Sequence, residues 1–312
     1  MLIIVGWFLC VLCTAAATGA PTGQSTGIDL HEGLIYSPTH EKLKLDLFLP
    51  QQRTKPVPCV IVIQGGGFMA SDGQQFRPFA RYLAENGFAA ALIAYRGRPR
   101  NTYLDSIFDV KAAVRFVRSV SAEYHIDPER IGAMGRSAGG TLAALLAVTG
   151  GMKEFEGDGG HQEFSSTIQA AVAYAGVFDF VARFTDKRQI ALQPRMKAKL
   201  ETNGEWIGEP FFPTGKHWMA ASAINHIDKS DPPMLLLHCK DDSTVPWIQS
   251  ENMRQKMNVA GIQTETEYYE SGGHGFVTKD PDVPRARMVT FFRKTLTGPT
   301  VSADGMKAAA KP

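Results

Sequence analysis

The sequence predicts an α/β protein with a mostly parallel sheet of eight strands and helices on both faces. Two observations predict this fold. Short apolar runs typical of buried strands alternate with longer segments of helical periodicity, from about residue 30 to residue 296. One of these runs breaks at glycines around Ser137 and continues as a helix, which is the pattern of a tight strand-to-helix turn.

The first half of the chain contributes five of the predicted strands. Residues 43–49 alternate apolar and polar side chains, whereas residues 59–63 are continuously apolar and predict a strand buried on both faces. Apolar side chains at helical spacing predict the helices between the strands. The predicted strands of this half are residues 33–37, 43–49, 59–63, 88–95 and 130–134, and the predicted helices are 75–85, 105–124 and 141–149.

The second half continues the alternation after an interruption. Residues 177–230 carry aromatic residues scattered among prolines and glycines without a clean period, which is typical of a lid or pocket wall. The alternative is a surface helix packed on the sheet edge. The remaining predicted strands are residues 169–175, 234–238 and 264–269, and the remaining helices are 245–259 and 283–296.

The two ends of the chain differ from this core. Residues 2–12 are almost wholly apolar and lead into small residues, which predicts a signal peptide over residues 1–20 and a secreted or periplasmic protein. No Lys or Arg precedes the apolar run, so an uncleaved anchor is an alternative, and a lipoprotein is another, although Val11-Leu12 before Cys13 is a poor lipobox. The main domain is then residues 21–296, and residues 297–312 are predicted to be a disordered tail.

Composition and charge exclude several classes of protein. The 312 residues contain 33 basic and 31 acidic side chains, without the basic runs or interleaved aromatic residues that favour nucleic acid. Beyond the signal segment, no span reaches the ~20 apolar residues of a membrane helix. Outside that segment only Cys59 and Cys239 remain, each in an apolar strand-like run, and we expect two buried free thiols rather than one disulfide.

Ser137 is the predicted nucleophile. Gly135 and Gly139 complete a G-x-S-x-G pattern, in which side chains at the glycine positions would collide within the turn. The helix that follows begins directly under the serine, so its N-terminal end favours negative charge on a bound substrate.

A serine nucleophile needs a histidine as base and a carboxylate that orients the histidine. Asp242 follows the strand that ends at His238, and His274 lies in a glycine-rich loop after the last strand. Asp241 is an adjacent candidate for the acid, but the Thr-Val-Pro sequence that starts the next helix favours Asp242.

Two glycine-rich turns supply candidate donors for an oxyanion. We expect the backbone amide of Ala138 and those of Gly66 and Gly67 to form the oxyanion hole, because glycine lets the backbone approach a substrate closely. The predicted substrate-binding residues are Phe68, Arg136, Trp206, Phe211 and Trp218, and the last three lie in aromatic loops that could stack on a sugar or phenol.

The ordered motifs resemble the esterase branch of the α/β-hydrolases that is related to hormone-sensitive lipase and to bifunctional acetylxylan and feruloyl esterases. The resemblance covers residues 30–296 and implies an α/β-hydrolase fold and hydrolysis of carboxylic esters, with no metal and no cofactor. One departure is Gln64, because such families usually have His at this position. The motifs are residues 64–68, 94–96, 109–118, 125–128, 135–140, 231–233, 242–246 and 273–276.

The expected substrates are short-chain acyl esters, with acetyl or feruloyl esters of plant polysaccharide foremost, so the expected partner is a small-molecule or oligosaccharide ester. A general carboxylesterase, a lipase and a catalytically silent binding module are the alternatives. His238, Cys239, Asp241 and Asp242 match no zinc or calcium spacing, and no metal site is predicted. The sequence does not specify an oligomeric state.

Overall fold

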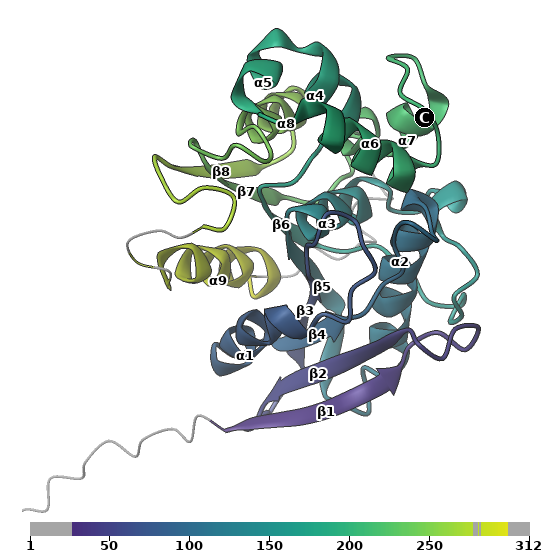
Figure 1. Ribbon diagram of the computed structural model, residues 1–312. Helices are drawn as coiled ribbons and strands as arrows, with labels where there is room; N and C mark the ends of the chain where they lie inside the picture. Colours follow the sequence, from purple (N-terminus) through teal and green to yellow (C-terminus); the bar gives the residue numbers. More distant parts are fainter. Residues whose placement is uncertain (1–26, 277–279, 281, 299–312) are drawn as a thin grey trace, which may run out of the picture.

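The computed structural model describes residues 27–276, 280 and 282–298 and contains one eight-stranded sheet with helices on both faces (Figure 1). The strand order is β1-β2-β4-β3-β5-β6-β7-β8. β2 pairs antiparallel with β1 and with β4, and the other neighbours are parallel. The predicted fold class is confirmed. The predicted signal peptide and all of the predicted tail except residues 297 and 298 lie outside the described residues.

The bounds of the elements mostly follow the predicted alternation. The strands are β1 (Ile28–Ile35), β2 (Lys44–Pro50), β3 (Val57–Ile63), β4 (Ala89–Ile93), β5 (Ile126–Arg136), β6 (Ala170–Tyr174), β7 (Met234–Cys239) and β8 (Thr264–Tyr269). The helices are α1 (Arg77–Glu85), α2 (Tyr103–Ser119), α3 (Ala138–Val148), α4 (Phe180–Thr185), α5 (Lys187–Leu192), α6 (Met196–Ile207), α7 (Lys216–Ala220), α8 (Ile248–Val259) and α9 (Asp282–Leu296). Short 3-10 turns cover Gln74–Phe76, Lys153–Phe155 and Ala223–Asn225.

Two strands, β1 and β5, begin several residues earlier than expected. β1 starts at Ile28 instead of residue 33, because the side chains of this edge strand are half-exposed or exposed and give no strong apolar signal. β5 starts at Ile126 instead of residue 130, so Asp127 and Pro128 belong to the strand. Pro128 is compatible with the start of a strand, where a missing N–H removes little pairing.

Each face of the sheet packs against its own set of helices. Val60 and Val62 of β3 belong to the core that α1 and α9 cover, and Ile61 and Ile63 belong to the core under α2, α3 and α8. Figure 1 shows α1 and α9 on one side of the strands and α2 and α3 on the other. β3 is therefore buried on both faces, as its apolar sequence predicts.

The interrupted region, residues 177–230, contains four helices, α4 to α7, which lie beyond one end of the central strands (Figure 1). Its aromatic side chains pack on one another: the ring centroid of Phe180 lies 5.6 Å from that of Trp206 and 6.4 Å from that of Trp218. Both tryptophans are fully buried. Aromatic packing, and not a regular apolar stripe, thus stabilises these short helices.

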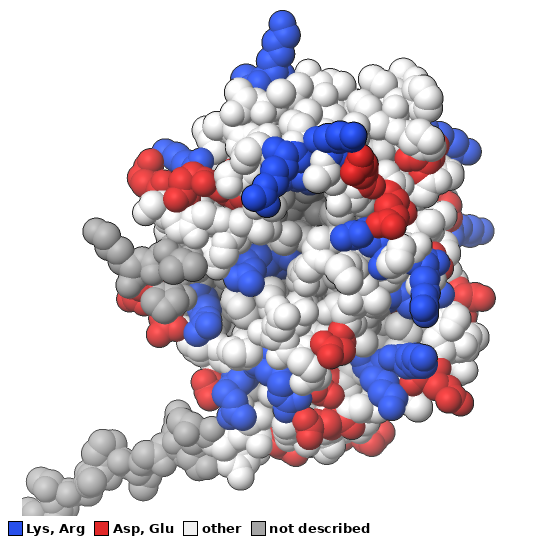
Figure 2. All heavy atoms as spheres, in the orientation of Figure 1, with Lys and Arg blue, Asp and Glu red and all other residues white. Residues whose placement is uncertain are grey.

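Cys59 and Cys239 are free and buried, as expected. Burial raises the pKa of Cys59 to about 12 and that of Cys239 to about 11, so both thiols are inert. Acidic and basic side chains are interspersed over the face drawn in Figure 2. Within the described residues, no helix combines the length and the hydropathy needed to cross a membrane.

Backbone atoms of three segments approach closely where β5 passes into α3. A Cβ atom on Gly139 would lie 2.1 Å from the carbonyl oxygen of Ile63 at the end of β3. A Cβ atom on Gly135 would lie 2.2 Å from the oxygen of Gly139, and one on Gly65 would lie 2.3 Å from that of Arg136. These distances leave no room for a side chain.

Gly139→Ala should therefore lower the free energy of unfolding by about 3 kcal/mol, since the added methyl group meets backbone atoms that cannot move independently. Urea denaturation monitored by circular dichroism measures the change. Gly150→Ala is the matched control, because its added Cβ would meet side-chain atoms of Thr167, at 3.3 and 3.9 Å, and no backbone atom within 4 Å. Equal stability of the two variants would contradict the close approach.

Candidate active site

Ser137 lies in the turn between β5 and α3 with a strained backbone. Its φ and ψ are 57° and −122°, a combination that non-glycine residues rarely adopt. The Ser137 amide donates to the carbonyl of Tyr174 on β6 at 2.8 Å, which fixes the turn against the neighbouring strand. Backbone strain at a polar residue, maintained by the surrounding structure, is typical of functional sites.

His274 connects Ser137 with Asp242. Its Nε2 lies 2.8 Å from Ser137 Oγ, and its Nδ1 lies 2.7 Å from Asp242 Oδ2. An ionised carboxylate can only accept, so Nδ1 carries the proton and donates it to Asp242. In the neutral imidazole, Nε2 is then free to accept the hydroxyl proton of Ser137. The structure thus brings the predicted serine, base and acid together in one hydrogen-bonded chain.

Asp242 is held as an ionised carboxylate although it is almost fully buried. Burial would raise its pKa, but hydrogen bonds from His238 and His274 outweigh this effect and hold the pKa well below its usual range. The backbone amides of Thr244 and Val245 also donate to its Oδ1, at 2.8 and 3.0 Å. Asp242 therefore keeps its negative charge beside His274 over the whole physiological pH range.

His238 is a member of this chain that the sequence analysis considered only as a metal ligand. It is fully buried near the end of β7, and its Nε2 lies 2.9 Å from the Val245 carbonyl and 3.3 Å from Asp242 Oδ2. Both neighbours are acceptors, so Nε2 carries the proton, and Nδ1 accepts from the Ser250 hydroxyl at 2.8 Å. His238 thus donates to the same carboxylate oxygen as His274 and supports the charge of Asp242. Its position four residues before Asp242 was the available signal.

The carboxylate of Asp241 has different hydrogen-bond partners from that of Asp242. Its carboxylate accepts from the amides of Gly272 and Gly273, at 3.1 and 2.8 Å, and so holds the loop that carries His274. Of the two candidate acids, the structure places Asp242 at the imidazole and Asp241 at the backbone of the histidine loop.

The loop after β3 reaches the same site. Gly66, Gly67 and Phe68 all have positive φ, at 145°, 61° and 64°. The Gln64 side-chain oxygen accepts from the Gln75 backbone amide at 2.8 Å, so this side chain braces the loop. Ala138 is the first residue of α3, and its amide belongs to the first turn, whose N–H groups have no partner within the helix. Gly67 and Ala138 both line the cavity beside Ser137, and Gly66 lies just outside it.

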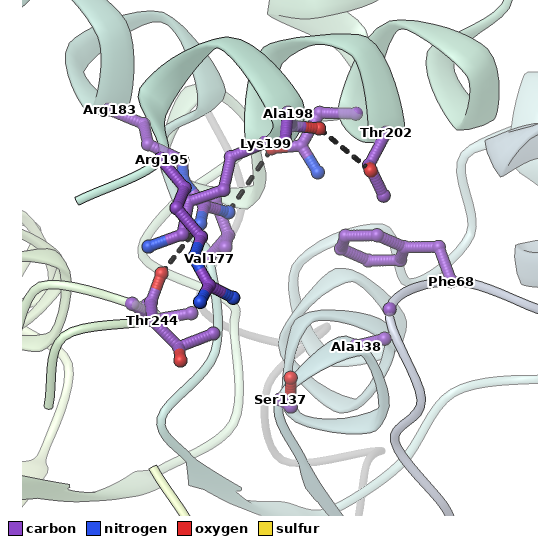
Figure 3. Close-up of a pocket in the computed structure, with 13 residues that line it drawn as sticks. Phe68, Ser137, Ala138, Val177, Arg183, Arg195, Ala198, Lys199, Thr202 and Thr244 are labelled. Atoms are coloured by element: carbon purple, nitrogen blue, oxygen red, sulfur yellow. Dashed lines mark hydrogen bonds between the residues drawn. The ribbon is translucent and has the colours of Figure 1, made fainter. Parts of the chain in front are cut away.

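A cavity of about 190 Å³ opens between Ser137 and α6 (Figure 3). In this view Ser137 and Ala138 lie on one side, Phe68 closes another side, and the α6 residues face them. Its lining residues are Gly67, Phe68, Ser137, Ala138, Val177, Arg183, Arg195, Ala198, Lys199, Thr202, Asn203, Thr244 and Val245.

Of the five residues predicted to bind substrate, only Phe68 lines this cavity. Trp206 is fully buried behind it and stacks on Phe68 with ring centroids 4.0 Å apart. Trp218 is also fully buried and donates from Nε1 to the Pro210 carbonyl. The prediction that these two tryptophans contact substrate is wrong, because their rings fill the space under the helices.

Arg136 and Phe211, which were also predicted to bind substrate, lie away from the cavity. The Arg136 guanidinium donates to the Gly275 carbonyl at 3.0 Å and lies over the Phe76 ring, so it supports the loop beside His274. Phe211 packs edge-on against Trp218 and lines a separate hollow beside α6. Neither side chain borders the cavity at Ser137.

The cavity lining also includes three cations that the sequence analysis missed: Arg183, Arg195 and Lys199. They come from α4, from the residue before α6 and from α6. The region has no clean periodicity, so the sequence alone does not show which faces of its helices turn toward Ser137.

The arrangement can perform acyl transfer. His274 can remove the Ser137 proton as the hydroxyl oxygen attacks a carbonyl carbon, and the charge of Asp242 stabilises the imidazolium that forms. Free amides at the start of α3 and in the glycine loop can stabilise the negative charge that develops on the carbonyl oxygen.

Comparison with known proteins gives one family over most of the chain, because residues 45–257 match the BD-FAE family. Over 211 residues the chain is 36% identical to a probable carboxylic ester hydrolase, LipM, of Mycobacterium tuberculosis, which covers 67% of this chain and 47% of that protein. The chain spans about half the length of the curated relatives it matches.

Solved structures with the same fold include esterases of carbohydrates. A truncated carbohydrate esterase from gut microbiota superposes with a TM-score of 0.75 and 28% identity, covering 86% of this chain and 97% of that one. An acetyl ester-xyloside bifunctional hydrolase from Caldicellulosiruptor lactoaceticus gives a TM-score of 0.67 and 25% identity, covering 80% of this chain and 88% of that one. These findings confirm the predicted kinship with α/β-hydrolase esterases.

Replacing Asp242 should affect Ser137 far more than replacing Asp241. Asp242→Asn should slow labelling of Ser137 by a fluorophosphonate by a factor on the order of 10³ to 10⁴, because an amide group turned toward Nδ1 favours the wrong imidazole tautomer. Asp241→Asn should change the rate by less than about tenfold, since its side-chain oxygen still accepts from the loop. Intact-protein mass spectrometry gives both rates. Equal rates, or the reverse order, would move the acid to Asp241.

Proposed function

Because the chain belongs to the BD-FAE family, we propose that it is a serine carboxylic ester hydrolase with Ser137 as nucleophile, His274 as base and Asp242 as orienting acid. The observation that carries the proposal is the continuous hydrogen-bonded chain from Ser137 Oγ through His274 to Asp242, with distances of 2.8 and 2.7 Å. A cavity beside the hydroxyl supplies room for an acyl group.

The reaction follows from this geometry in two halves. Ser137 Oγ bonds to the ester carbonyl carbon while its proton passes to His274 Nε2, and the amides of Ala138 and Gly67 stabilise the oxyanion. The bond to the alcohol oxygen then breaks, and His274 returns the proton to the departing alcohol. In the second half His274 removes a proton from water, which attacks the acyl-enzyme and releases the carboxylic acid and free Ser137.

Ser137→Ala should reduce ester hydrolysis by at least about 10³-fold, because no other atom can form the acyl-enzyme. Turnover of 4-nitrophenyl acetate measures the loss, and circular dichroism establishes that the variant is folded. Ser119→Ala removes a hydroxyl at the end of α2 that, among the described residues, bonds only to the Phe116 carbonyl of the same helix, and it should keep the parental rate. A Ser137→Ala protein that retains more than a few per cent of the rate would contradict the assignment.

The size of the cavity supports short acyl groups. Its volume of about 190 Å³ is below the ~300 Å³ at which pockets for drug-sized ligands begin. Phe68, supported by the stacked Trp206, forms a wall that a longer acyl chain would meet. We therefore place acetyl esters ahead of longer ones, and a lipase-like preference for long chains is disfavoured.

The alcohol is proposed to be a carbohydrate. This choice is supported by the similar solved structures, two of which are named a carbohydrate esterase and an acetyl ester-xyloside hydrolase. The predicted export of the chain would bring it to extracellular polysaccharide. Stacking of a sugar ring on Trp206 or Trp218 does not support a carbohydrate alcohol, since both rings are buried.

A panel of 4-nitrophenyl esters should show the highest kcat/KM for acetyl to butyryl groups and a steep fall beyond roughly eight carbons, as the chain outgrows the cavity. Acetylated xylan oligomers should release acetate, and feruloylated oligomers serve as the comparison within the same class of alcohol. Preference for long-chain triglyceride emulsions would make the protein a lipase. Rapid cleavage of simple acetyl esters without release of any acid from a carbohydrate ester would leave it a general carboxylesterase.

A further inference from the structure

The cavity beside Ser137 has an unbalanced charge. Three of its lining residues are cations, Arg183, Arg195 and Lys199, and none of its lining residues is a carboxylate. Within the described residues, none of the three forms an ion pair. The charge of Asp242 acts on Arg183 and Lys199, but this carboxylate is already bonded to His238 and His274. Cations gathered in a partly enclosed space repel one another, so a further anion among them would be favourable.

The carboxylates nearest in sequence serve other partners. Glu205 of α6 pairs with Arg98 at 2.6 Å, and Glu201 lies 4.0 Å from Lys197. Both carboxylates line the hollow on the other side of α6 and not the cavity at Ser137. The carboxylates of α6 therefore lie at that hollow, whereas Lys199 of the same helix lines the cavity at Ser137.

Arg183 is buried, and its hydrogen-bond partners among the described residues are neutral, although the charge of Asp242 acts on it from nearby. Its guanidinium donates to the side-chain oxygens of Gln193 and Asn203 and to the Thr244 carbonyl, at 3.1, 3.1 and 2.8 Å. Burial lowers its pKa to about 10, which still leaves it charged at neutral pH. It therefore adds a fixed positive charge behind the cavity wall.

Lys199 and Arg195 extend this charge into the cavity. Lys199 donates to the Ser243 carbonyl at 2.6 Å, and burial together with the neighbouring Arg183 lowers its pKa to about 8, with Arg195 adding to the effect and the charge of Asp242 opposing it. An anion between the cations would reverse this repulsion.

Arg195 is the most exposed of the three and has no side-chain partner among the described residues. Its backbone is left-handed, with φ 63° and ψ 35°, just before α6 begins. In Figure 3 its side chain extends from that point into the cavity on the side of Ser137, and Figure 2 shows basic side chains gathered over a hollow in the same region. Five donors of a guanidinium are thus directed toward the space where a substrate would lie.

We propose that Arg195, Lys199 and Arg183 form a subsite for a carboxylate carried by the ester substrate, in addition to the ester group itself. On a carbohydrate alcohol such a group is that of a uronic acid. The guanidinium of Arg195 makes the direct contact, the ammonium of Lys199 lies beside it, and the buried charge of Arg183 strengthens both. The inference rests on the proposed ester hydrolysis.

Two isosteric pairs of esters test the subsite. 4-Acetoxybenzoate and 4-acetoxybenzamide differ by one charge on the alcohol part, and the 4-nitrophenyl monoesters of adipic acid and of adipamic acid differ by one charge on the acyl part. The protein should show a higher kcat/KM for the charged member of one pair, and the pair that responds identifies the side of the ester that bears the carboxylate. Arg195→Gln and Lys199→Gln should each lower that charged-to-neutral ratio by about tenfold, the effect of one charge-assisted hydrogen bond.

Lys197→Gln is the matched control, because it removes one positive charge from α6 at a side chain that is 91% exposed. Its charged-to-neutral ratio should stay within about twofold of the parent, as expected for a solvated surface charge. A parent that does not prefer the charged member of either pair, or a preference that Arg195→Gln leaves unchanged, overturns the subsite while ester hydrolysis stands. An equal loss on both members would likewise overturn it, since it would assign the cations to the oxyanion common to all substrates.

If no ester is turned over and fluorophosphonate does not label Ser137, the proposed function fails, and binding then decides the subsite. Calorimetric titration of Ser137→Ala with 4-acetoxybenzoate should give an affinity that Arg195→Gln weakens by about tenfold. An affinity equal to that for 4-acetoxybenzamide would overturn the subsite independently of catalysis.

Discussion

The close approach of three backbone segments around Ser137 is the constraint on which the site depends. Only glycine fits at residues 65, 135 and 139, because a Cβ atom there would come within 2.3 Å of a carbonyl oxygen on a neighbouring segment. The contact holds the glycine loop after β3 directly against the serine turn. A strained backbone at Ser137 is tolerated because β3, β5 and β6, all buried in the sheet, fix both of its ends.

The second constraint is electrostatic, and it joins the last two strands to that turn. Asp242 is buried yet ionised because His238 and His274 both donate to its Oδ2, and the amides of the turn before α8 donate to its Oδ1. Asp241 uses the adjacent carboxylate to hold the loop that carries His274. Asp242 therefore orients the imidazole ring of His274, whereas Asp241 orients the backbone of the loop that carries it.

The sequence was informative where backbone geometry limits the choice of residue. Glycines around Ser137 and before His274, and the order of serine, aspartate and histidine after successive strands, predict both the sheet and the meeting of these three side chains. The sequence was not informative about the lining of the cavity. Trp206 and Trp218 are indistinguishable in sequence from surface aromatics, and only the packing of short helices buries them. Arg195 and Lys199 line the cavity from the start of α6, which follows the left-handed backbone of Arg195, and no periodicity in the sequence encodes this placement.

Arg98 gives this architecture a mechanical link between its two halves. Its Nε donates to the Gly67 carbonyl at 2.8 Å, and its Nη1 pairs with Glu205 of α6 at 2.6 Å. The Arg98 side chain thus connects the glycine-rich loop beside Ser137 with helix α6, which borders the cavity. Substitutions that moved α6 so that the cavity could admit larger molecules would also displace Gly67, because Arg98 is bonded to both. Substrate range and reaction rate would then change together, and separating them would first require a new partner for Arg98.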